Sequence, residues 1–232
     1  MRKYRIPVDR TDITIKKSYL VLEVGPGHNP SKRSDVLVEK YINNNEHRCG
    51  DVKVYQHQKL LNYDGDNMPF NNKHFDYVIC NQVLEHTDNP SDFCKELSRV
   101  SKRGYLECPS FLGEFLFPKE SHAWVIMEEQ GVLYAMKKNH NLYKQDFGNF
   151  FLNIYPYKSL LWRLLQMSVQ NLCFVRIEWN ENIVCRIVET SKDEGFHLFD
   201  TKNIQEFIHK PSINKICKSL LVLIRVQLRK LI

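Results

Sequence analysis

Short apolar runs alternate with polar turns along the first half of the chain. In most of these runs the apolar residues follow one another with little alternation, which is typical of a strand buried on both faces of a sheet. Gly25 closes the first run and Pro109 closes the last. The runs, each predicted to be a strand, are residues 20–24, 35–39, 51–58, 75–80 and 105–108.

One segment between these strands has helical spacing instead. Phe93, Leu97 and Val100 fall on one face of a helix predicted over residues 91–102, and Ser91 is its expected N-cap. Strand, turn, strand, helix and strand in this order predict an α/β fold. We expect a mostly parallel sheet with helices on both faces.

The second half of the chain has a different pattern. Two polar triplets, at 128–130 and 180–182, are each flanked by apolar segments, and this arrangement predicts antiparallel hairpins. The hairpin strands are expected over 122–127 with 131–137, and over 174–179 with 183–188. Residues 157–170 have helical spacing. The last segment, 211–232, is predicted to be a C-terminal amphipathic helix, with basic residues on a face separate from its apolar stripe: Lys215, Lys218, Arg225 and Arg229.

The composition is that of a globular protein. Of 232 residues, 43% are hydrophobic and 26% are charged, which excludes disorder over the whole chain and suits a single domain over 1–210. The net charge is +6, but acidic residues are mixed with the basic ones along the chain. No uniformly basic face results, so no specific nucleic-acid binding is predicted. The seven cysteines include no C-x-x-C pair, which indicates free thiols and no metal site. With no leader pattern and no apolar run of spanning length, we expect a cytoplasmic protein.

Two features at the carboxyl ends of the first strands point to a ligand site. The sequence Glu23-Val24-Gly25-Pro26-Gly27 ends a strand in a glycine turn, and a turn without Cβ atoms lets backbone approach a ligand closely. Glu39 ends the next strand, where a carboxylate can accept hydrogen bonds from a ribose diol. Taken singly, each is equally explained as an ordinary turn or a solvated acid.

Two further features follow in the same order. The segment 64–70 begins Asp64-Gly65-Asp66 and continues with apolar residues, a pattern that can bracket an adenine ring. A buried strand then leads into Asn81 and further polar residues at its carboxyl end, where open α/β sheets bind ligands.

The four features together resemble a known family. The segments VLEVGPGHNP, DVLVEKY, DGDNMPF and FDYVICNQVLEH, within residues 20–110, are similar to those of class I S-adenosylmethionine-dependent methyltransferases. The similarity is to the small methyltransferase-domain family, which includes the ubiquinone and menaquinone enzymes. The resemblance implies a Rossmann-like fold, S-adenosylmethionine as cofactor, and a cofactor-binding half over about 18–110. The residues it implies for the cofactor are Glu23, Gly25 and Gly27 around the methionine part, Glu39 at the ribose, Asp64, Gly65 and Asp66 at adenine, and Asn81 near the sulfonium.

The connection after the glycine turn departs from the family pattern. Asn29 stands where a third glycine is usual, and only residues 28–34 separate the turn from the second strand. A full crossover helix needs about ten or more residues, so we expect the first helix to be reduced to a turn. This weakens the alternative of a nicotinamide-dependent oxidoreductase, because a pyrophosphate is usually held at a helix N-terminus. A non-catalytic S-adenosylmethionine-binding regulatory module remains the other alternative.

The sequence contains no clear catalytic motif. Methyl transfer from a sulfonium needs alignment and exclusion of water, and a general base only when the acceptor must lose a proton. His86, just beyond the strand predicted over 75–80, is the first candidate base, and His122 is the second; both are also explained as structural residues. No N/D-P-P-Y/F tetrad is present, which argues against methylation of adenine N6 or of a glutamine amide.

The acceptor is not identified by any motif, and a small molecule, a lipid or a glycan precursor is favoured. An acceptor lid is predicted over about 110–157, although its aromatic residues are equally explained as the core of the added hairpin. The helix over 211–232 provides either peripheral contact with an anionic membrane or packing against the domain or a partner. The aromatic residues of the lid segment are Phe111, Phe115, Phe117, Trp124, Tyr134, Tyr143, Phe147, Phe150 and Phe151.

Overall fold

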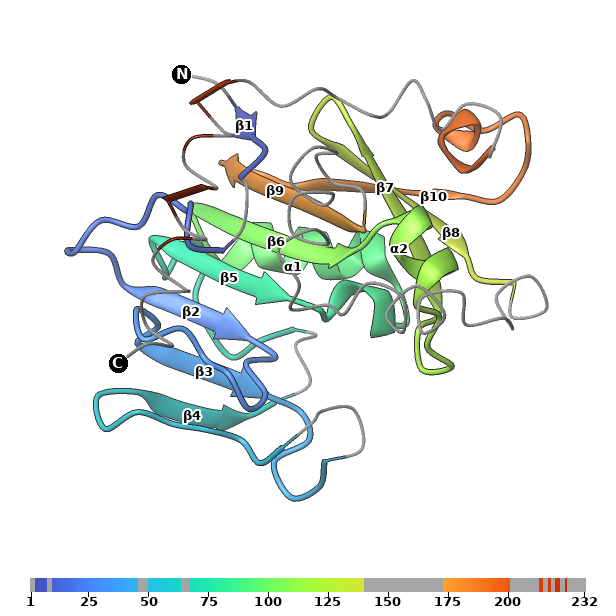
Figure 1. Cartoon of the computed structure of the whole chain (residues 1–232). Coiled ribbons are helices and arrows are strands. Elements are labelled where there is room, and N and C mark those ends of the chain that lie inside the picture. The colour runs from blue at the N-terminus through green and yellow to red at the C-terminus, as the bar shows by residue number, and fades with distance from the viewer. Residues whose placement is uncertain are drawn as a thin grey trace.

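A seven-stranded sheet forms the centre of the molecule (Figure 1). The computed structural model describes residues 3–7, 10–45, 50–63, 67–139 and 173–200, and within the C-terminal segment residues 213, 214, 217, 220, 221 and 224. The strand order is β1-β9-β6-β5-β2-β3-β4, and only β9 runs antiparallel to its neighbours. The strands are β1 (Tyr4–Arg5), β2 (Val21–Val24), β3 (Val36–Glu39), β4 (Lys59–Asn62), β5 (Tyr77–Asn81), β6 (Arg103–Pro109) and β9 (Phe174–Asn180).

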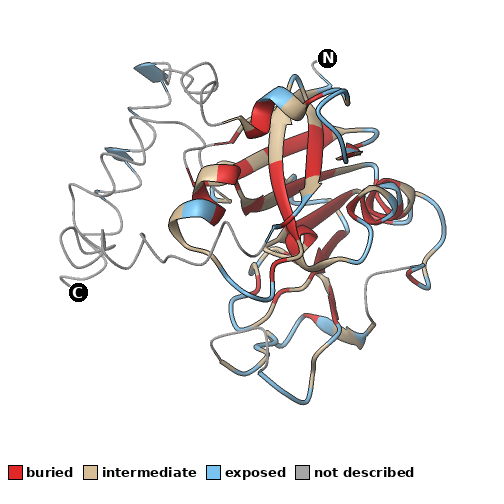
Figure 2. Cartoon of the chain, turned by 90° about the vertical axis from the view of Figure 1, so that its right-hand side faces the viewer, coloured by how far each residue is buried: buried red, intermediate tan, exposed pale blue. Residues whose placement is uncertain are grey.

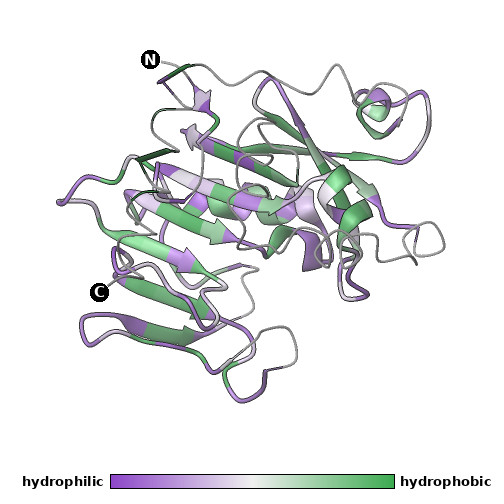
Figure 3. Ribbon diagram, viewed as in Figure 1, coloured by the Kyte–Doolittle hydropathy of each residue, from purple (hydrophilic) through white to green (hydrophobic). Residues whose placement is uncertain are grey.

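This topology confirms the predicted Rossmann-like α/β fold. The chain runs outward from β2 through β3 to β4, and then returns to β5 on the other side of β2. The order of the strands therefore reverses between β2 and β5. In open α/β sheets the crevice at such a reversal, beyond the carboxyl ends of the strands, is where ligands bind. Figure 3 shows these central strands as hydrophobic and most of their connecting loops as hydrophilic.

The helix α1 (Pro90–Val100) covers one face of the sheet with an apolar stripe that includes Phe93 and Leu97, both buried. Its N-cap is Asn89, whose side chain accepts hydrogen bonds from the backbone of Ser91 and Asp92 at 3.0 and 3.1 Å. The prediction that Ser91 is the N-cap was therefore wrong. Proline fits the first helical position because no hydrogen bond is lost there, so the helix begins earlier than expected.

The other face of the sheet is covered in part by the N-terminal segment. Ile13, Ile15 and Tyr19 pack on a buried cluster contributed by the outward-facing side chains of β2, β5 and β6. Burial on both sides accounts for the continuous apolar character of these strands. Figure 2 shows the same arrangement, with the buried parts of the chain concentrated along the strands and on the inner side of the helices.

A second, three-stranded sheet packs against the first. Its strands are β7 (Trp124–Glu129), β8 (Val132–Lys137) and β10 (Val184–Val188), in the order β10-β8-β7. The predicted hairpin of β7 and β8 is confirmed. Gln130 and Gly131 join its strands, both with positive φ, as the tight turn of a twisted hairpin requires.

The second predicted hairpin was wrong, because β9 and β10 do not pair. β9 pairs along its whole length with β6, whereas β10 joins the other sheet parallel to β8. Between them, Glu181 N donates to Lys102 O at 2.9 Å, and Ile183 N donates to the hydroxyl of Ser98 on α1 at 3.0 Å. These bonds tie the connection to the end of the helix and lead the chain from one sheet to the other.

The remaining predictions of strands and helices have different outcomes. The strand expected over 51–58 was wrong: Val54 is exposed, Gln58 N donates to Tyr55 O in a turn at 2.9 Å, and the strand is β4, which begins only at Lys59. The first helix is reduced to a turn, as expected, since no helix is assigned to residues 25–35. The helix predicted over 157–170 lies outside the described residues. In the C-terminal segment, the six described residues are helical and exposed.

Candidate cofactor and acceptor site

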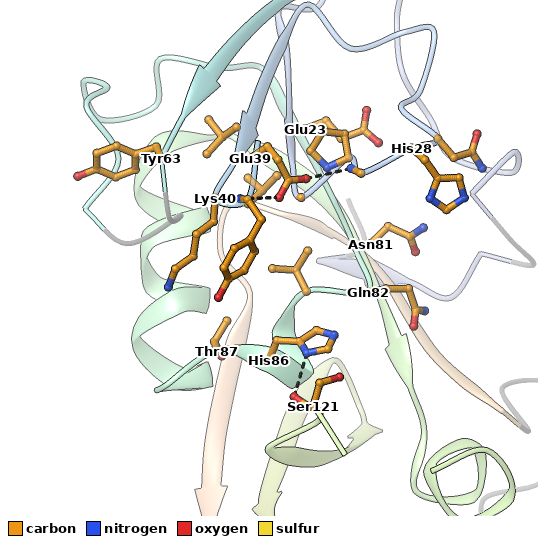
Figure 4. Close-up of a pocket in the computed structure, with 18 of the residues that line it drawn as sticks. Glu23, His28, Glu39, Lys40, Tyr63, Asn81, Gln82, His86, Thr87 and Ser121 are labelled. Carbon is orange, nitrogen blue, oxygen red and sulfur yellow. Dashed lines mark hydrogen bonds between the residues drawn. The ribbon is translucent and has the colours of Figure 1, made fainter. Parts of the chain in front are cut away.

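A pocket of about 400 Å³ opens at the reversal between β2 and β5. Its volume is in the range of small-molecule sites. Figure 4 shows Glu23 and Glu39 on one side of the pocket and His86, Thr87 and Ser121 on another, with Asn81 and Gln82 between them. The lining residues that carry the argument below are Glu23, Gly25, Gly27, Glu39, Tyr41, Tyr63, Asn81, Gln82, His86, Thr87, Asp88, Lys119 and Ser121.

The glycine turn after β2 forms one wall of this pocket. Gly25 and Gly27 have φ of 63° and 53°, in the left-handed region that glycine adopts without strain. Gly25 N donates to Val38 O at 2.8 Å, which holds the turn beside β3. A Cβ at Gly25 would lie 2.4 Å from a methyl group of Val83, so a larger residue would collide with the segment that follows β5.

Glu39 lies where the resemblance implied, at the carboxyl end of β3 and in the pocket wall. Its carboxylate accepts from Gly27 N at 3.1 Å and from Tyr41 N at 3.2 Å. These two bonds orient a carboxylate that is 8% exposed. A carboxylate oriented by backbone amides is suited to accept hydrogen bonds from neighbouring hydroxyl groups.

Glu23 is the more deeply placed acid. Its side chain accepts from Ser34 Oγ at 2.6 Å and from Ser31 N at 2.8 Å, and so it braces the shortened connection between β2 and β3. Burial raises the pKa of Glu23 above its ordinary value, and the hydrogen bonds from Ser34 and Ser31 offset part of that rise. This acid therefore supports the loop as well as lining the pocket.

Asn81 and Gln82 present polar atoms to the same pocket. Asn81 Oδ1 and Gln82 Nε2 are buried and have no hydrogen-bond partner among the described residues. Gln82 has φ of 58°, a strained conformation for a residue with a side chain. Buried polar atoms without partners are rare in proteins, and in a pocket wall they indicate groups kept for a ligand.

The adenine-bracketing residues of the sequence analysis, Asp64, Gly65 and Asp66, lie outside the described residues. Tyr63, directly before them, lines the pocket. Sequence reasoning missed the pocket positions of Tyr41 and Gln82, although both lie inside segments that carried the resemblance. It also missed Lys119 and Ser121, and no sequence signal could have found these two, because only the packing of β7 brings their segment to the pocket.

The two candidate histidines lie next to each other. His86 ends a short 3₁₀ helix, η1 (Leu84–His86), and its ring lies 4.7 Å from the ring of His122, centroid to centroid. His86 Nδ1 is 3.0 Å from Ser121 O, and His122 Nδ1 is 2.5 Å from a carboxylate oxygen of Glu114. A carbonyl or carboxylate only accepts, so Nδ1 carries the proton in both rings, and the lone pair of each neutral imidazole is on Nε2.

Glu114 is itself anchored. It lies on α2 (Phe111–Leu116) and accepts hydrogen bonds from both His122 and Lys138 Nζ, all three being buried. Burial opposes the charge on Glu114, but the bonds from His122 and Lys138 outweigh it and lower the pKa of this carboxyl below its ordinary value. Glu114 is therefore an ionised partner that fixes the orientation of the His122 ring.

Glu85 lies on the other side of His122 in a different environment. Its carboxyl group is 1% exposed, and neither of its oxygens has a hydrogen-bond partner among the described residues. Burial raises the pKa of Glu85 to about 8. Ala123 N donates to Glu85 O, and Trp124 Nε1 donates to Thr87 O, both at 2.8 Å, so β7 is bonded to the segment that carries Glu85 and His86.

Three of the described aromatic residues of the predicted lid belong to the core, whereas Phe115 is exposed. Phe111 and Tyr134 are buried in a cluster of the second sheet, and Trp124 in the main core, and none of the three lines the pocket. The part of the lid over 140–157 lies outside the described residues and stays a prediction.

Several known proteins are similar to parts of this chain. Residues 37–106 match the family model of a methyltransferase domain. An uncharacterized protein of Methanocaldococcus jannaschii is 34% identical over 68 residues, which cover 27% of this chain and 33% of that protein, so the chain spans about a third of the length of this relative.

Two solved structures are also similar to the chain. A SAM-dependent methyltransferase of Thermotoga maritima has 20% identity and a TM-score of 0.29 over 40% of this chain and 44% of that one. The YcgJ protein of Bacillus subtilis has 14% identity and a TM-score of 0.39 over 72% of this chain and 93% of that one.

The segment matched by the family model contributes several residues to the pocket. The family match begins in β3 and ends in β6, and it therefore includes Glu39, Asn81 and His86. This part of the chain is therefore similar to a methyltransferase domain.

Proposed function

We propose that this protein transfers a methyl group from S-adenosylmethionine to a hydroxyl-bearing acceptor: a small molecule, a lipid or a glycan precursor. One observation carries the proposal. The glycine turn, the Glu39 carboxylate and the unpartnered amides of Asn81 and Gln82 all open into one pocket, which continues to His86. A single pocket can then hold a cofactor and an acceptor in contact.

The residues of the pocket form two ends, one for the cofactor and one for the acceptor. The bound cofactor supplies an activated methyl group on a sulfonium. Gly25 and Gly27 allow close approach of the amino-acid part, Asn81 and Gln82 offer it hydrogen bonds, and Glu39 accepts from the ribose. Positioning of this kind accounts for much of the rate enhancement of a displacement reaction, because the two reacting groups are already held next to each other.

The acceptor end of the pocket favours a polar substrate. His86, Thr87, Asp88, Lys119 and Ser121 line it, and each carries a hydrogen-bonding side chain. His86 has its lone pair on Nε2 and can take a proton from an acceptor hydroxyl. A hydroxyl group is a weak nucleophile until it loses that proton, so a base placed here has a chemical purpose.

The alternatives of a regulatory module and a nicotinamide enzyme are separable by experiment. Calorimetry with S-adenosylhomocysteine and with NAD distinguishes the cofactors, and we expect heat of binding only with the first. Incubation with labelled S-adenosylmethionine and fractionated cell extract then tests catalysis. Binding without any labelled product in lipid, glycan, metabolite, protein or RNA fractions would favour the regulatory module.

Replacing Glu39 with alanine is expected to weaken S-adenosylhomocysteine binding about ten- to a hundredfold. The loss corresponds to roughly 1.5–3 kcal/mol for charge-assisted hydrogen bonds to the ribose. Calorimetry measures it, and an unchanged thermal unfolding temperature shows that the fold is kept. Asp35→Ala is the matched control, since Asp35 bonds Val21 N outside the pocket. Equal affinities for wild type and Glu39→Ala would remove Glu39 from the cofactor site.

We also propose that the segment 211–232, predicted to be an amphipathic helix, makes peripheral contact with an anionic membrane, which supports a lipid or lipid-linked acceptor. Its described apolar side chains at Ile213, Leu220, Leu221 and Ile224 are exposed, Ile213 by 79%. Basic residues alternate with them in the sequence, and an apolar stripe with basic flanks is typical of interfacial helices. No helix among the described residues has the length and apolar character needed to cross a bilayer.

Full-length protein is expected to sediment with phosphatidylserine-containing vesicles at low salt. The double substitution Leu220→Ser with Leu221→Ser should reduce the bound fraction about tenfold or more, because each leucine contributes up to roughly 1.5–3 kcal/mol when buried in lipid. Salt should weaken the binding as well, through the basic residues. If wild type stays in the supernatant at low salt, the helix contacts the domain or a partner protein instead.

A further inference from the structure

Three side chains with metal-binding atoms converge at the acceptor end of the pocket. Glu85, His86 and His122 each offer one ligand atom, and these atoms lie within 4.8 Å of one another. The three come from two distant parts of the sequence. Contact between β7 and η1 brings them together, through the hydrogen bonds that Ala123 and Trp124 make to the η1 segment.

The ligand atoms of Glu85 and His122 lack hydrogen-bond partners among the described residues. Both carboxylate oxygens of Glu85 and Nε2 of His122 are buried without a hydrogen bond among the described residues, and both side chains are 1% exposed. His122 Nε2 and Glu85 Oε1 are 3.9 Å apart, too far for a hydrogen bond. Leaving such groups buried and unsatisfied is costly, which indicates that something else occupies the space between them.

The surroundings of the two imidazoles are those of metal ligands. His122 Nδ1 is bonded to Glu114, and His122 Nε2 lies 3.9 Å from a carboxyl oxygen of Glu85, so this ring presents Nε2 to the cluster; His86 Nδ1 is bonded to Ser121 O. Histidines that bind metals almost always donate their other N–H to a carbonyl or a carboxylate in this way. Lys138 pairs with Glu114, so Glu85 is the carboxyl group of the cluster that would bind an ion, and it would give up its proton on binding.

We infer that Glu85, His86 and His122 bind one divalent transition-metal ion of the zinc type at the acceptor end of the pocket. Two imidazoles and one carboxylate are a donor set of catalytic zinc sites and of related first-row metals, and they leave coordination positions open. Ligand atoms on one such ion lie about 3–3.5 Å apart, so the three side chains would move together by roughly 1 Å on binding. Mg²⁺ prefers oxygen ligands and is not favoured here.

The location assigns a role to the ion, and this role rests on the proposed methyl transfer. His86 lines the pocket, whereas Glu85 and His122 lie behind it, so an open coordination position would face the acceptor. An acceptor hydroxyl that coordinates the ion would lose its proton more readily, as metal-bound water does. Substrates with two adjacent oxygen atoms would be especially suited to such a site.

Titration of chelator-treated protein with Co²⁺ tests the site without any acceptor. We expect one equivalent to bind and to produce the visible absorption bands of cobalt in a low-symmetry nitrogen and oxygen site. Zn²⁺ should displace it, with its affinity measured by competition against a chromogenic chelator. Glu85→Gln and His122→Gln are each expected to weaken Zn²⁺ binding on the order of a hundredfold, since loss of outer partners alone costs 10–100-fold.

The control is His197→Gln, because His197 is a half-exposed histidine outside the pocket, bonded to Glu129. It should leave Zn²⁺ affinity unchanged. Calorimetry with S-adenosylhomocysteine, run on the same samples, reports on the cofactor site and the fold separately. Retained cofactor binding in wild type without a cobalt spectrum would overturn the metal site and leave the proposed function standing. Equal Zn²⁺ affinities in wild type, Glu85→Gln and His122→Gln would equally overturn it.

Discussion

Replacing His86 with alanine is expected to lower methyl transfer by about 10²- to 10⁴-fold, with the affinity for S-adenosylhomocysteine nearly unchanged. His86 lines the acceptor end of the pocket, while the cofactor end is built from the carboxyl ends of β2, β3 and β5. Its Nδ1 is bonded to Ser121 O, so in the neutral ring Nε2 carries the lone pair that would take a proton or bind a metal ion. Either role is lost with the ring.

The measurement is the initial rate of label transfer from S-adenosylmethionine to the acceptor fraction found with cell extract. His57→Ala is a matched control, since His57 is exposed and does not line the pocket. An unchanged rate for His86→Ala would show that the acceptor needs no base here. Parallel losses of rate, cofactor affinity and stability would show that His86 is a structural residue of η1.

Replacing Trp179 with alanine is expected to destabilise the fold by about 3–5 kcal/mol. Trp179 is 1% exposed and is among the largest fully buried side chains, on β9 opposite Gly104 of β6. The ring fills the space that Gly104 leaves: a Cβ at Gly104 would lie 2.4 Å from it and 2.6 Å from Val78. Truncation therefore leaves a cavity between the central strands that their backbones cannot close.

Urea denaturation measures this loss as a lower midpoint at a similar slope. Trp179→Phe separates volume from polarity, because Trp179 Nε1 is buried without a hydrogen-bond partner among the described residues. Phenylalanine loses some volume but also removes that donor, so we expect a much smaller destabilisation than for alanine. A loss with phenylalanine as large as with alanine would contradict the packing argument. So would an alanine variant as stable as the wild type.

The local pattern of the sequence determined the parallel half of the fold. The apolar runs at 20–24, 35–39 and 75–80 are β2, β3 and β5, because a strand buried on both faces needs apolar side chains on both. The glycine turn and Glu39 follow from the same pattern, since functional groups of this fold lie directly after its strands. These features depend on neighbours in the sequence and are visible in it.

Pairing between distant segments was decided only in the tertiary structure. The polar triplet at 180–182 is compatible with a hairpin, yet β9 finds its partner in β6 and β10 finds its own in β8. A strand pairs with whichever edge buries its apolar face, and the edge is created by other parts of the chain. In the same way, 51–58 had suitable residue types, but the edge of β3 pairs with β4 over Lys59–Asn62 instead.

The acceptor end of the site also depends on contacts that only the tertiary structure decided. The sequence identified His86 and His122 as separate candidates, but nothing in it connected them to each other, to Glu85 or to Glu114. Their convergence depends on β7 passing beside η1, a contact between segments held together by long-range hydrogen bonds. The sequence by itself thus determined the cofactor half, where chemistry follows each strand locally. Only the tertiary structure assembled the acceptor half, because its side chains become neighbours through packing alone.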